Sequence, residues 1–372
     1  TMDAIYEVHG LTKRYGRTAA LNGVDFAVTP GKLVGLLGPN GSGKTTLMKI
    51  SAGLLQPTAG SVIIDKVPVG VFTKAVTSYL PDRMALPTEF TADDAVSLYA
   101  DFFTDFDKVK ANALLADLHI GGRDKIDSMS KGTQEKMQLC LTMSRAARLY
   151  LLDEPLGALD LKLRKEMQLE LKRLQREMNI TFIYVTHDQE EALTMSDTVV
   201  VMNGGKVQQI GTPEDIYNEP KNAFVADFIG ESNILNGTMV RDGVVRMYRR
   251  EFQCVDGGFA PNEPVDVVIR PEDIDIVPVE QGQLVGTVTN VTFKGMQYDI
   301  IVDLGGFKWL IQTTDHSPVG AQVGVKIDPD GFHIMKKSEY SGMFGDYSSY
   351  SEEYEELADA TLADEEESGD EE

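Results

Sequence analysis

Runs of apolar and β-branched residues, separated by polar or glycine-bearing turns, recur through the first part of the chain. Runs of this kind predict short, buried strands. The predicted strands are 4–8, 24–28, 33–37, 61–65, 149–153 and 181–185. Helix-compatible stretches lie between them, at 46–52, at 92–118 and in a longer pattern that follows 128–134 and ends near Arg148. The mixture of strands and helices predicts an α/β fold.

A different pattern fills the segment 161–178, where apolar residues recur at helical spacing with Lys, Arg and Glu between them. This spacing predicts a half-buried helix whose charged positions face solvent. The earlier stretch 92–118 is acidic and rich in aromatic residues, which predicts a small helical subdomain at about 82–148. Its aromatic residues form a core or, in part, a docking face for a partner: Tyr99, Phe102, Phe103 and Phe106.

The second part of the chain has short strands punctuated by glycine. The strands are predicted at 286–292, 299–303, 307–311 and 323–327. This pattern predicts a small all-β, OB-like barrel, which we expect to regulate or dimerise rather than to catalyse. The expected domains are therefore 1–230 and 231–337, followed by a tail at 338–372.

The net charge of the chain is concentrated in the predicted tail. The 372 residues carry a net charge of −23, which argues against a nucleic-acid-binding surface. The tail accounts for 14 Asp and Glu residues and has no Lys or Arg. A run of like charges without apolar periodicity predicts disorder and no catalytic role.

Composition also limits the location of the protein. The sequence shows no apolar run near the roughly 18 to 20 residues that a membrane helix needs, and the acidic Asp3 and Glu7 do not suit a signal peptide. We therefore expect a soluble cytoplasmic protein. The two cysteines, Cys140 and Cys254, are too few for a disulfide framework or a zinc site.

A glycine-rich loop between the predicted strand 33–37 and the predicted helix 46–52 matches the pattern G-x-x-x-x-G-K-[ST]. In this context the loop is typical of a phosphate-binding loop, in which backbone N–H groups and the helix N-terminus face the phosphates of a nucleoside triphosphate. We expect the lysine to reach the β- and γ-phosphates and the first threonine to reach Mg²⁺. The expected nucleotide-binding residues here are Gly38, Pro39, Asn40, Gly41, Ser42, Gly43, Lys44, Thr45 and Thr46.

Two later strands deliver polar groups where phosphate chemistry needs them. The strand 149–153 ends in Asp153 and Glu154. We expect Asp153 to lie near Mg²⁺ and Glu154 to polarise the attacking water. His187 follows the strand 181–185, which should lie beside the first, so we expect His187 to contact the γ-phosphate.

Tyr15 precedes the phosphate loop in the sequence and has two readings. An isolated tyrosine is more often a half-buried packing residue, but beside a nucleotide site it can stack on the base. The phosphate loop favours stacking.

Together these motifs resemble an ATP-binding cassette (ABC) ATPase over roughly residues 5–229. The resemblance implies that Tyr15 stacks on adenine, and that Ser130 and Gly132 contact the γ-phosphate bound by the opposite subunit. It also implies that Asp160 acts across the seam of a head-to-tail homodimer that holds two ATP molecules.

From about residue 150 the sequence is similar to importer ATPases of the spermidine/putrescine type, through the segments 151–160, 184–192, 211–217 and 267–273. This resemblance implies an ATPase subunit at the cytoplasmic face of the cell membrane. Its implied partners are integral membrane permease subunits and, through them, an external substrate-binding protein. Lys44, Glu154 and His187 are then the expected catalytic residues.

Two positions depart from that family. Asp82 stands where the family has a glutamine that senses the γ-phosphate, and the signature reads Met-Ser-Lys-Gly-Thr. We assign Asp82 to the metal site with Thr45 and Asp153. The part before Leu149 is closer to short exporter-type ABC ATPases, so an exporter ATPase stays open as an alternative. A second alternative, of another class, is an ATP-dependent dimerisation switch with little hydrolysis.

Overall fold

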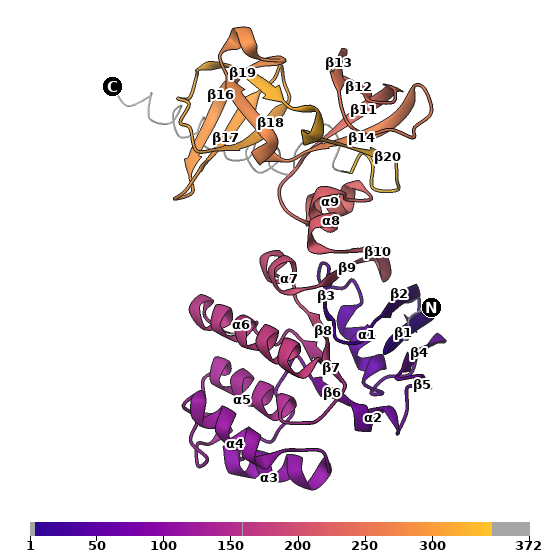
Figure 1. Cartoon of the computed structure of the whole chain (residues 1–372), viewed down its shortest axis with the longest axis vertical. Helices are drawn as coiled ribbons and strands as arrows, with labels where there is room; N and C mark the ends of the chain where they lie inside the picture. The colour runs from indigo at the N-terminus through magenta and orange to yellow at the C-terminus, as the bar shows by residue number, and fades with distance from the viewer. Residues whose placement is uncertain (1–3, 158, 344–372) are drawn as a thin grey trace, which may run out of the picture. The chain divides into compact units, whose positions relative to one another are not determined.

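The computed structural model describes residues 4–157 and 159–343. The chain divides into two compact units, Thr1–Glu214 and Asp215–Glu372. Each unit has its own sheets and its own core, and each is described separately below (Figure 1).

The first unit contains two sheets. The larger has six strands in the order β10 (Lys206–Gly211), β9 (Thr198–Asn203), β3 (Leu33–Leu37), β8 (Thr181–Val185), β7 (Leu149–Asp153) and β6 (Thr77–Leu80). Its central strands are parallel, and only β10 runs antiparallel to its neighbour. The smaller, antiparallel sheet has the order β2 (Thr18–Val28), β1 (Tyr6–Tyr15), β4 (Ala59–Ile64) and β5 (Val67–Pro68). The parallel strands bring the chemistry-bearing loops to one edge, because their carboxyl ends meet there.

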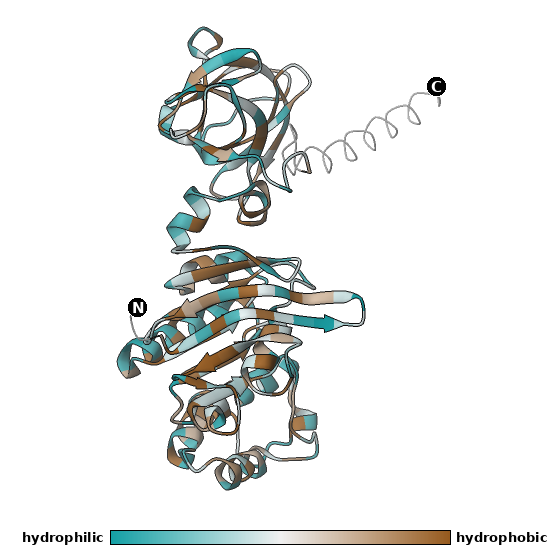
Figure 2. Ribbon diagram, turned by 90° about the vertical axis from the view of Figure 1, so that its right-hand side faces the viewer, coloured by the Kyte–Doolittle hydropathy of each residue, from teal (hydrophilic) through white to brown (hydrophobic). Residues whose placement is uncertain are grey.

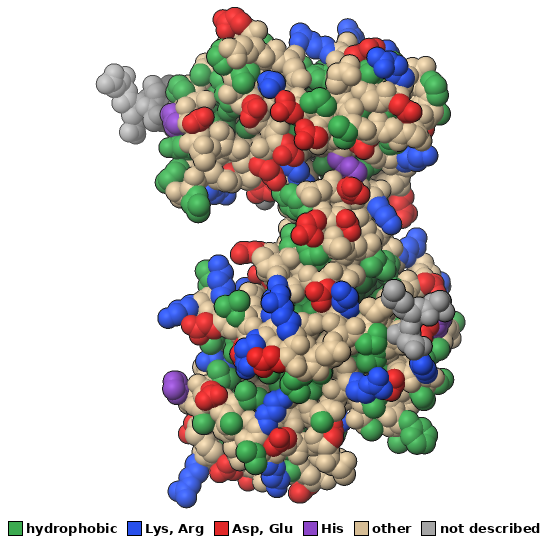
Figure 3. Space-filling model, in the orientation of Figure 1, with side chains coloured by type: hydrophobic (Ala, Val, Ile, Leu, Met, Phe, Trp, Pro, Cys, Tyr) green, Lys and Arg blue, Asp and Glu red, His purple; other side chains and the backbone are tan. Residues whose placement is uncertain are grey.

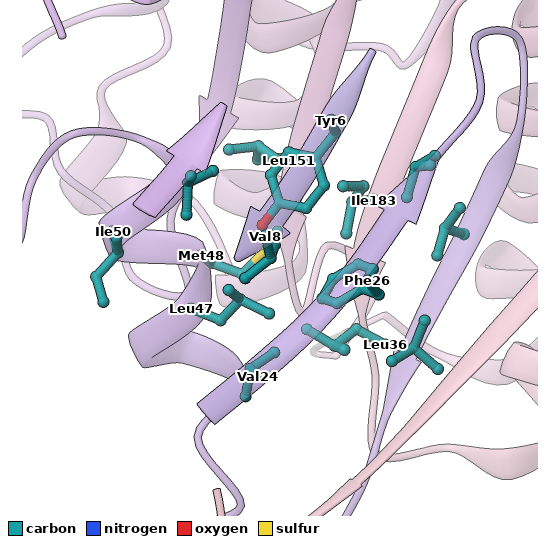
Figure 4. Close-up of a cluster of buried hydrophobic side chains, with 14 of the residues drawn as sticks. Tyr6, Val8, Val24, Phe26, Leu36, Leu47, Met48, Ile50, Leu151 and Ile183 are labelled. Carbon is teal, nitrogen blue, oxygen red and sulfur yellow. The ribbon is translucent and has the colours of Figure 1, made fainter. Parts of the chain in front are cut away.

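The core between these two sheets also takes in helix α1 (Lys44–Ser51). Figure 4 shows Leu47, Met48 and Ile50 of this helix among the side chains of both sheets. At its centre the hydroxyl groups of Tyr6 and Ser51 are hydrogen-bonded at 2.7 Å. The helix that follows the phosphate loop is therefore anchored over its whole apolar face.

Helices cover the other face of the large sheet, where α6 (Leu161–Met178) and α7 (Gln189–Met195) share a core with β3, β7 and β8 (Figure 1). The sequence predicted α6 with the same limits. Asp160 caps its start by accepting a hydrogen bond from the Leu163 amide, and Asn179 ends it in the left-handed conformation.

The helical subdomain contains α3 (Ala92–Phe102), α4 (Lys108–Asp117) and α5 (Lys131–Met143), and the short helix α2 (Thr73–Val76) precedes β6. The helix-compatible stretch 92–118 contains two helices, and the Asp107 side chain caps the second by accepting hydrogen bonds from the amides of Val109 and Lys110. The prediction of a helix to about Arg148 was wrong. The helix ends at Met143, and Arg145 turns away to pair with Asp105 at 3.1 Å.

Some aromatic residues of this subdomain pack against one another, and one is exposed. Tyr99 contacts Phe103 and Phe106, with ring centroids 5.5 and 5.6 Å apart. Phe102 is exposed. Of the four predicted aromatic residues, Tyr99 and Phe106 pack against the subdomain core.

The second unit also has two sheets, which share a single core. The first has the order β13 (Arg250–Gln253), β12 (Val244–Met247), β11 (Asn233–Arg241), β14 (Glu263–Ile269) and β20 (Phe332–Lys336). The second has the order β15 (Ile274–Val277), β19 (Gln322–Ile327), β16 (Leu284–Phe293), β17 (Tyr298–Asp303) and β18 (Lys308–Thr313). Its edge strands β15 and β18 contact each other, so this sheet curls around apolar side chains as the predicted OB-like barrel does (Figure 2).

The helices α8 (Pro213–Asn218) and α9 (Ala223–Phe228) lie before these sheets in the chain. The predicted domain boundary at 230 lies after both helices, whereas the compact units divide at Glu214. The difference has a physical cause. Arg270 donates hydrogen bonds to the carbonyl oxygens of Tyr217 at 2.5 Å and Ala226 at 3.0 Å, which holds both helices to the second unit.

The tail predicted to be disordered from 338 falls outside the described residues from 344 onward. Residues 338–343 form a turn, in which Tyr340 packs on Phe224 with ring centroids 5.4 Å apart. On the face shown in Figure 3, acidic and basic side chains intermix over the described surface.

Candidate active site

The phosphate loop leaves β3, whose five residues are all buried, and enters α1. Glycine is required at two of its positions. Gly43 has φ +102°, and a Cβ atom there would lie 2.3 Å from the Ala20 carbonyl oxygen. A Cβ atom at Gly38 would lie 2.2 Å from the Met202 carbonyl oxygen. The loop therefore keeps its curled form only with these glycines.

Lys44 begins α1 and is buried. Its ammonium group donates hydrogen bonds to the carbonyl oxygens of Gly38 at 2.7 Å and Pro39 at 3.0 Å. Burial lowers the pKa of Lys44, while the carboxylates of Glu154 and Asp153 oppose that effect. The Lys44 ammonium group is thus a buried hydrogen-bond donor that the first residues of the loop hold in place.

Asp153 ends β7 beside this loop. Its Oδ1 accepts a hydrogen bond from the Thr45 hydroxyl at 3.2 Å, while its Oδ2 is buried and has no hydrogen-bond partner among the described residues. Burial, together with the neighbouring charge of Asp82, raises the pKa of Asp153 to about 6. A buried carboxylate with one unpaired oxygen is an environment that a cation would stabilise.

Glu154 comes next, and its backbone turns sharply. Its φ is +52°, in the left-handed region that non-glycine residues rarely adopt, and its N–H donates to the Val185 carbonyl at 3.1 Å. The Glu154 Oε1 atom lies 3.6 Å from Nδ1 of His187, which follows the adjacent parallel strand β8. The structure therefore brings these two predicted residues together.

A cavity of about 240 Å³ lies beside the loop. It is lined by Ala20, Asn40, Gly41, Gly43, Lys44, Thr45, Thr46 and Glu154. Sequence reasoning missed Ala20, which β2 contributes. An alanine carries no chemical signal, so only the tertiary structure could show it.

Several other predicted residues do not line this cavity, and Tyr15 is the first of them along the chain. Tyr15 ends β1 and pairs with Thr18, and the strand pair extends this far because Leu11 and Leu21 anchor it in the core. The Tyr15 ring is half exposed, with Lys13 Nζ 5.2 Å from its centroid.

Ser130 and Gly132 lie at the start of α5, where the Ser130 hydroxyl accepts a hydrogen bond from the Thr133 amide at 3.2 Å. Asp160 is exposed at the start of α6. Asp82 is also exposed and acts on the site through its charge on Asp153. Their predicted roles remain predictions.

Two family models match the chain: ABC transporter over residues 21–157 and TOBE domain over residues 267–335. The first match covers the phosphate loop and the strand that ends in Asp153. The second covers the curled sheet of the second unit.

Relatives match across both units. The spermidine/putrescine import ATP-binding protein PotA of Desulfitobacterium hafniense is 44% identical over 350 residues, which is 90% of this chain and 98% of the relative. This chain belongs to the ABC transporter ATP-binding protein family that includes PotA. The PotA protein of Clostridium acetobutylicum is 45% identical over 342 residues, 90% of this chain and 97% of the relative. As an ABC family member, the chain is an ATP-binding, ATP-hydrolysing transporter subunit.

Solved structures support the same fold. A structure described as the ATP-binding subunit of an ABC transporter matches with a TM-score of 0.53 and 28% identity, over 57% of this chain and 91% of that chain. The dimeric bacterial ABC transporter cassette MJ0796 matches with a TM-score of 0.52 and 24% identity, over 56% of this chain and 98% of that chain. The α/β fold with a following β domain, as the sequence predicted, is confirmed.

Within the described residues, no helix is long and apolar enough to cross a membrane.

Proposed function

We propose that this ABC family member hydrolyses ATP to drive a membrane importer for polyamines, from the cytoplasmic face of the cell membrane. The observation that carries the proposal is the grouping of Lys44, Asp153, Glu154 and His187 at the carboxyl ends of adjacent strands. Relatives that match nearly from end to end are named as spermidine/putrescine import proteins. That name supports polyamines as the cargo.

The residues around Asp153 fit Mg²⁺. The buried Oδ2 atom of Asp153, which has no partner in the part of the chain that the structure describes, and the Thr45 hydroxyl on its other oxygen supply hard oxygen ligands, the kind that Mg²⁺ prefers. When bound, the ion would neutralise charge on the β- and γ-phosphates. Asp82 is a further candidate, because its charge already acts on Asp153.

The side chains of this chain then divide the work. Lys44 binds phosphate oxygens and anchors the nucleotide in the cavity. Glu154 accepts the proton of the attacking water at its carboxylate. Because Glu154 lines the cavity, this carboxylate lies beside the bound nucleotide. His187, 3.6 Å from Glu154, orients that carboxylate and contacts the γ-phosphate. Tyr15 stacks on the adenine ring.

Ser130, Gly132 and Asp160 serve a second copy of the chain. Ser130 and Asp160 are exposed and lie outside the cavity lining, so their side chains are accessible to a nucleotide held by a partner. The resulting homodimer would act on integral membrane permease subunits and, through them, on an external substrate-binding protein.

The first test is steady-state ATP hydrolysis by the purified chain. Glu154→Gln should lower turnover by about 10² to 10⁴, the usual contribution of a general base, while ATP affinity is retained. Glu166→Gln, an exposed glutamate on α6, is the matched control and should hydrolyse normally. Full turnover in Glu154→Gln would contradict the assignment, and a wild-type chain that binds ATP without turnover would indicate the dimerisation switch.

The second test concerns the cargo and its direction. Cells that express the chain with its permease and binding protein should accumulate labelled spermidine or putrescine, and Glu154→Gln should abolish this uptake. Polyamine efflux driven by the wild-type chain would instead indicate an exporter.

A further inference from the structure

One arginine outside the predicted site connects the two loops that carry its chemistry. Arg164 lies in the first turn of α6, and its Nη1 atom is 3.1 Å from Oδ2 of Asp188. Its Nη2 atom donates a hydrogen bond to the Leu159 carbonyl oxygen at 3.2 Å. A single guanidinium group therefore binds both a side chain and a backbone carbonyl, which its fork of donors allows.

The two ends of this bridge belong to functional loops. Leu159 lies in the segment between Glu154 and Asp160, which joins the proposed general base to the proposed dimer seam. Asp188 directly follows His187. Arg164 thus holds the loop after β7 to the loop after β8.

Asp188 is itself fixed to its surroundings. Its Oδ1 atom accepts a hydrogen bond from the Glu191 amide at 3.0 Å, which caps α7, and its own N–H donates to the Thr186 hydroxyl at 3.0 Å. The Thr186 hydroxyl in turn donates to Glu191 Oε2 at 2.9 Å. A displacement of Asp188 would therefore move the whole turn that contains His187.

By contrast, the functional side chains have little support of their own. The His187 side chain is 61% exposed, and its Nδ1 atom lies 3.6 Å from Oε1 of Glu154. The Glu154 backbone already holds a left-handed conformation. The Glu154 N–H joins the bases of the two loops through the Val185 carbonyl, and the position of the side chains beyond that bond depends on how firmly the rest of the two loops is joined.

We propose that Arg164 is a positioning residue for ATP hydrolysis, which keeps His187 and Glu154 in register by joining the Leu159 and Asp188 loops. The proposal rests on the roles assigned above to Glu154 and His187. Arg164 does not line the nucleotide cavity, so it should affect turnover and leave ATP binding unchanged. Misplacement of a catalytic group by about 1 Å can cost about 10²-fold in rate.

A purely structural ion pair would behave differently. Both partners are about a quarter to a third exposed, and pairs of this kind contribute little to stability. If the contact were only structural, its loss would leave kcat nearly unchanged in the folded protein.

The test uses the full chain and steady-state ATP hydrolysis, with the melting temperature recorded for each variant. Arg164→Met should lower kcat at least tenfold with the KM for ATP within about twofold. Asp188→Asn keeps a good helix cap and removes the charge, so it should lower kcat to a similar extent. The double variant should be no slower than the slower single variant, because both changes break the same contact.

Two further variants complete the test. Arg173→Met removes another arginine from α6, one that pairs with Glu170 and Glu177, and it should keep wild-type kcat. Arg164→Lys keeps the charge but cannot form the same two-armed bridge, so its kcat should lie between those of Arg164→Met and the wild type. This variant also serves if Arg164→Met does not fold.

Three results would overturn the proposal: kcat of Arg164→Met within twofold of wild type, an equal loss in Arg173→Met, or losses in the Arg164 and Asp188 variants that multiply in the double variant. In each case a wild-type chain that hydrolyses ATP and a Glu154→Gln variant that does not would leave the proposed function standing. A wild-type chain without turnover would overturn both.

Discussion

Glu191 should make the first unit less stable as pH rises. This residue lies on α7, three positions after the Asp188 cap, and is 5% exposed. Burial raises the pKa of Glu191 to about 7, although the Thr186 hydroxyl and the charge of Arg164 oppose this. Its Oε1 atom has no hydrogen-bond partner among the described residues. The folded chain therefore favours the protonated carboxyl.

The direction of the pH effect follows from linkage. Between pH 4.5, the ordinary value, and pH 7 the folded state binds a proton at Glu191 that the unfolded state releases. Stability therefore falls as pH rises through this window, and the full cost is present above about pH 7. A shift of this size corresponds to about 3 kcal/mol, or roughly 6 to 12 °C in melting temperature for a unit of about 200 residues.

Glu191→Gln removes this titration. The amide can still accept the Thr186 hydrogen bond, and any cost of burying its NH₂ group is independent of pH. The melting temperature of the variant relative to wild type should therefore rise between pH 5 and pH 8. The exposed neighbour Glu190, changed to Gln, is the matched control and should show no such slope.

The chain offers an internal reference for this assay. Its one tryptophan, Trp309, is buried in the second unit, so its fluorescence follows the unfolding of that unit. The far-ultraviolet helical signal comes mainly from the first unit, which holds α3 to α7. A difference between Glu191→Gln and wild type that stays constant with pH would refute the argument, as would an equal change in Trp309 fluorescence.

Three further predictions concern single side chains. Lys44→Ala removes a buried cation from the phosphate loop and should weaken ATP binding several-fold or more in an equilibrium titration. An unchanged ATP affinity would contradict the role of Lys44 in phosphate binding. Asp82→Gln removes a negative charge that acts on Asp153 and that would repel the γ-phosphate. Basal ATP turnover, measured without a membrane partner, should therefore rise by up to about tenfold. An equal or slower rate in the variant would exclude this repulsion. Tyr6→Phe removes the hydroxyl bonded to Ser51 and should lower the free energy of unfolding, measured by denaturant titration, by about 1 kcal/mol. The cost is small because Ser51 still donates a hydrogen bond to the Leu47 carbonyl. A loss above about 3 kcal/mol would indicate that the surrounding core is also disrupted.

The sequence predicted three strands of the large sheet, β3, β7 and β8, because each is a short and almost wholly apolar run, but it did not predict β6, β9 and β10. The strands β3, β7 and β8 have the predicted limits, and all their residues are buried. Each also ends in residues with obvious chemistry. A phosphate loop, an Asp-Glu pair and a histidine on adjacent parallel strands must meet at one edge, so their grouping was predictable.

Contacts between loops were not predictable in this way. Arg164 and Asp188 lie 24 positions apart, and their contact depends on how α6 crosses the sheet. In the sequence, Arg164 is one of several charged residues on a helix that reads as half exposed, and most such residues do face solvent. Arg173 on the same helix pairs with its neighbours Glu170 and Glu177 as that reading expects. Nothing local distinguishes the two arginines.

The adjacent carboxylates Asp153 and Glu154 show what the backbone adds to a motif. Asp153 belongs to an extended strand and is buried, whereas Glu154 has a left-handed backbone and a side chain 36% exposed. Two chemically similar groups thus receive opposite environments within one residue. The buried carboxylate suits a fixed cation, because burial leaves one of its oxygens in need of a partner. The exposed carboxylate suits proton transfer, because water can reach it. The left-handed turn at Glu154 separates the two roles, and the letters Asp-Glu alone do not specify that turn.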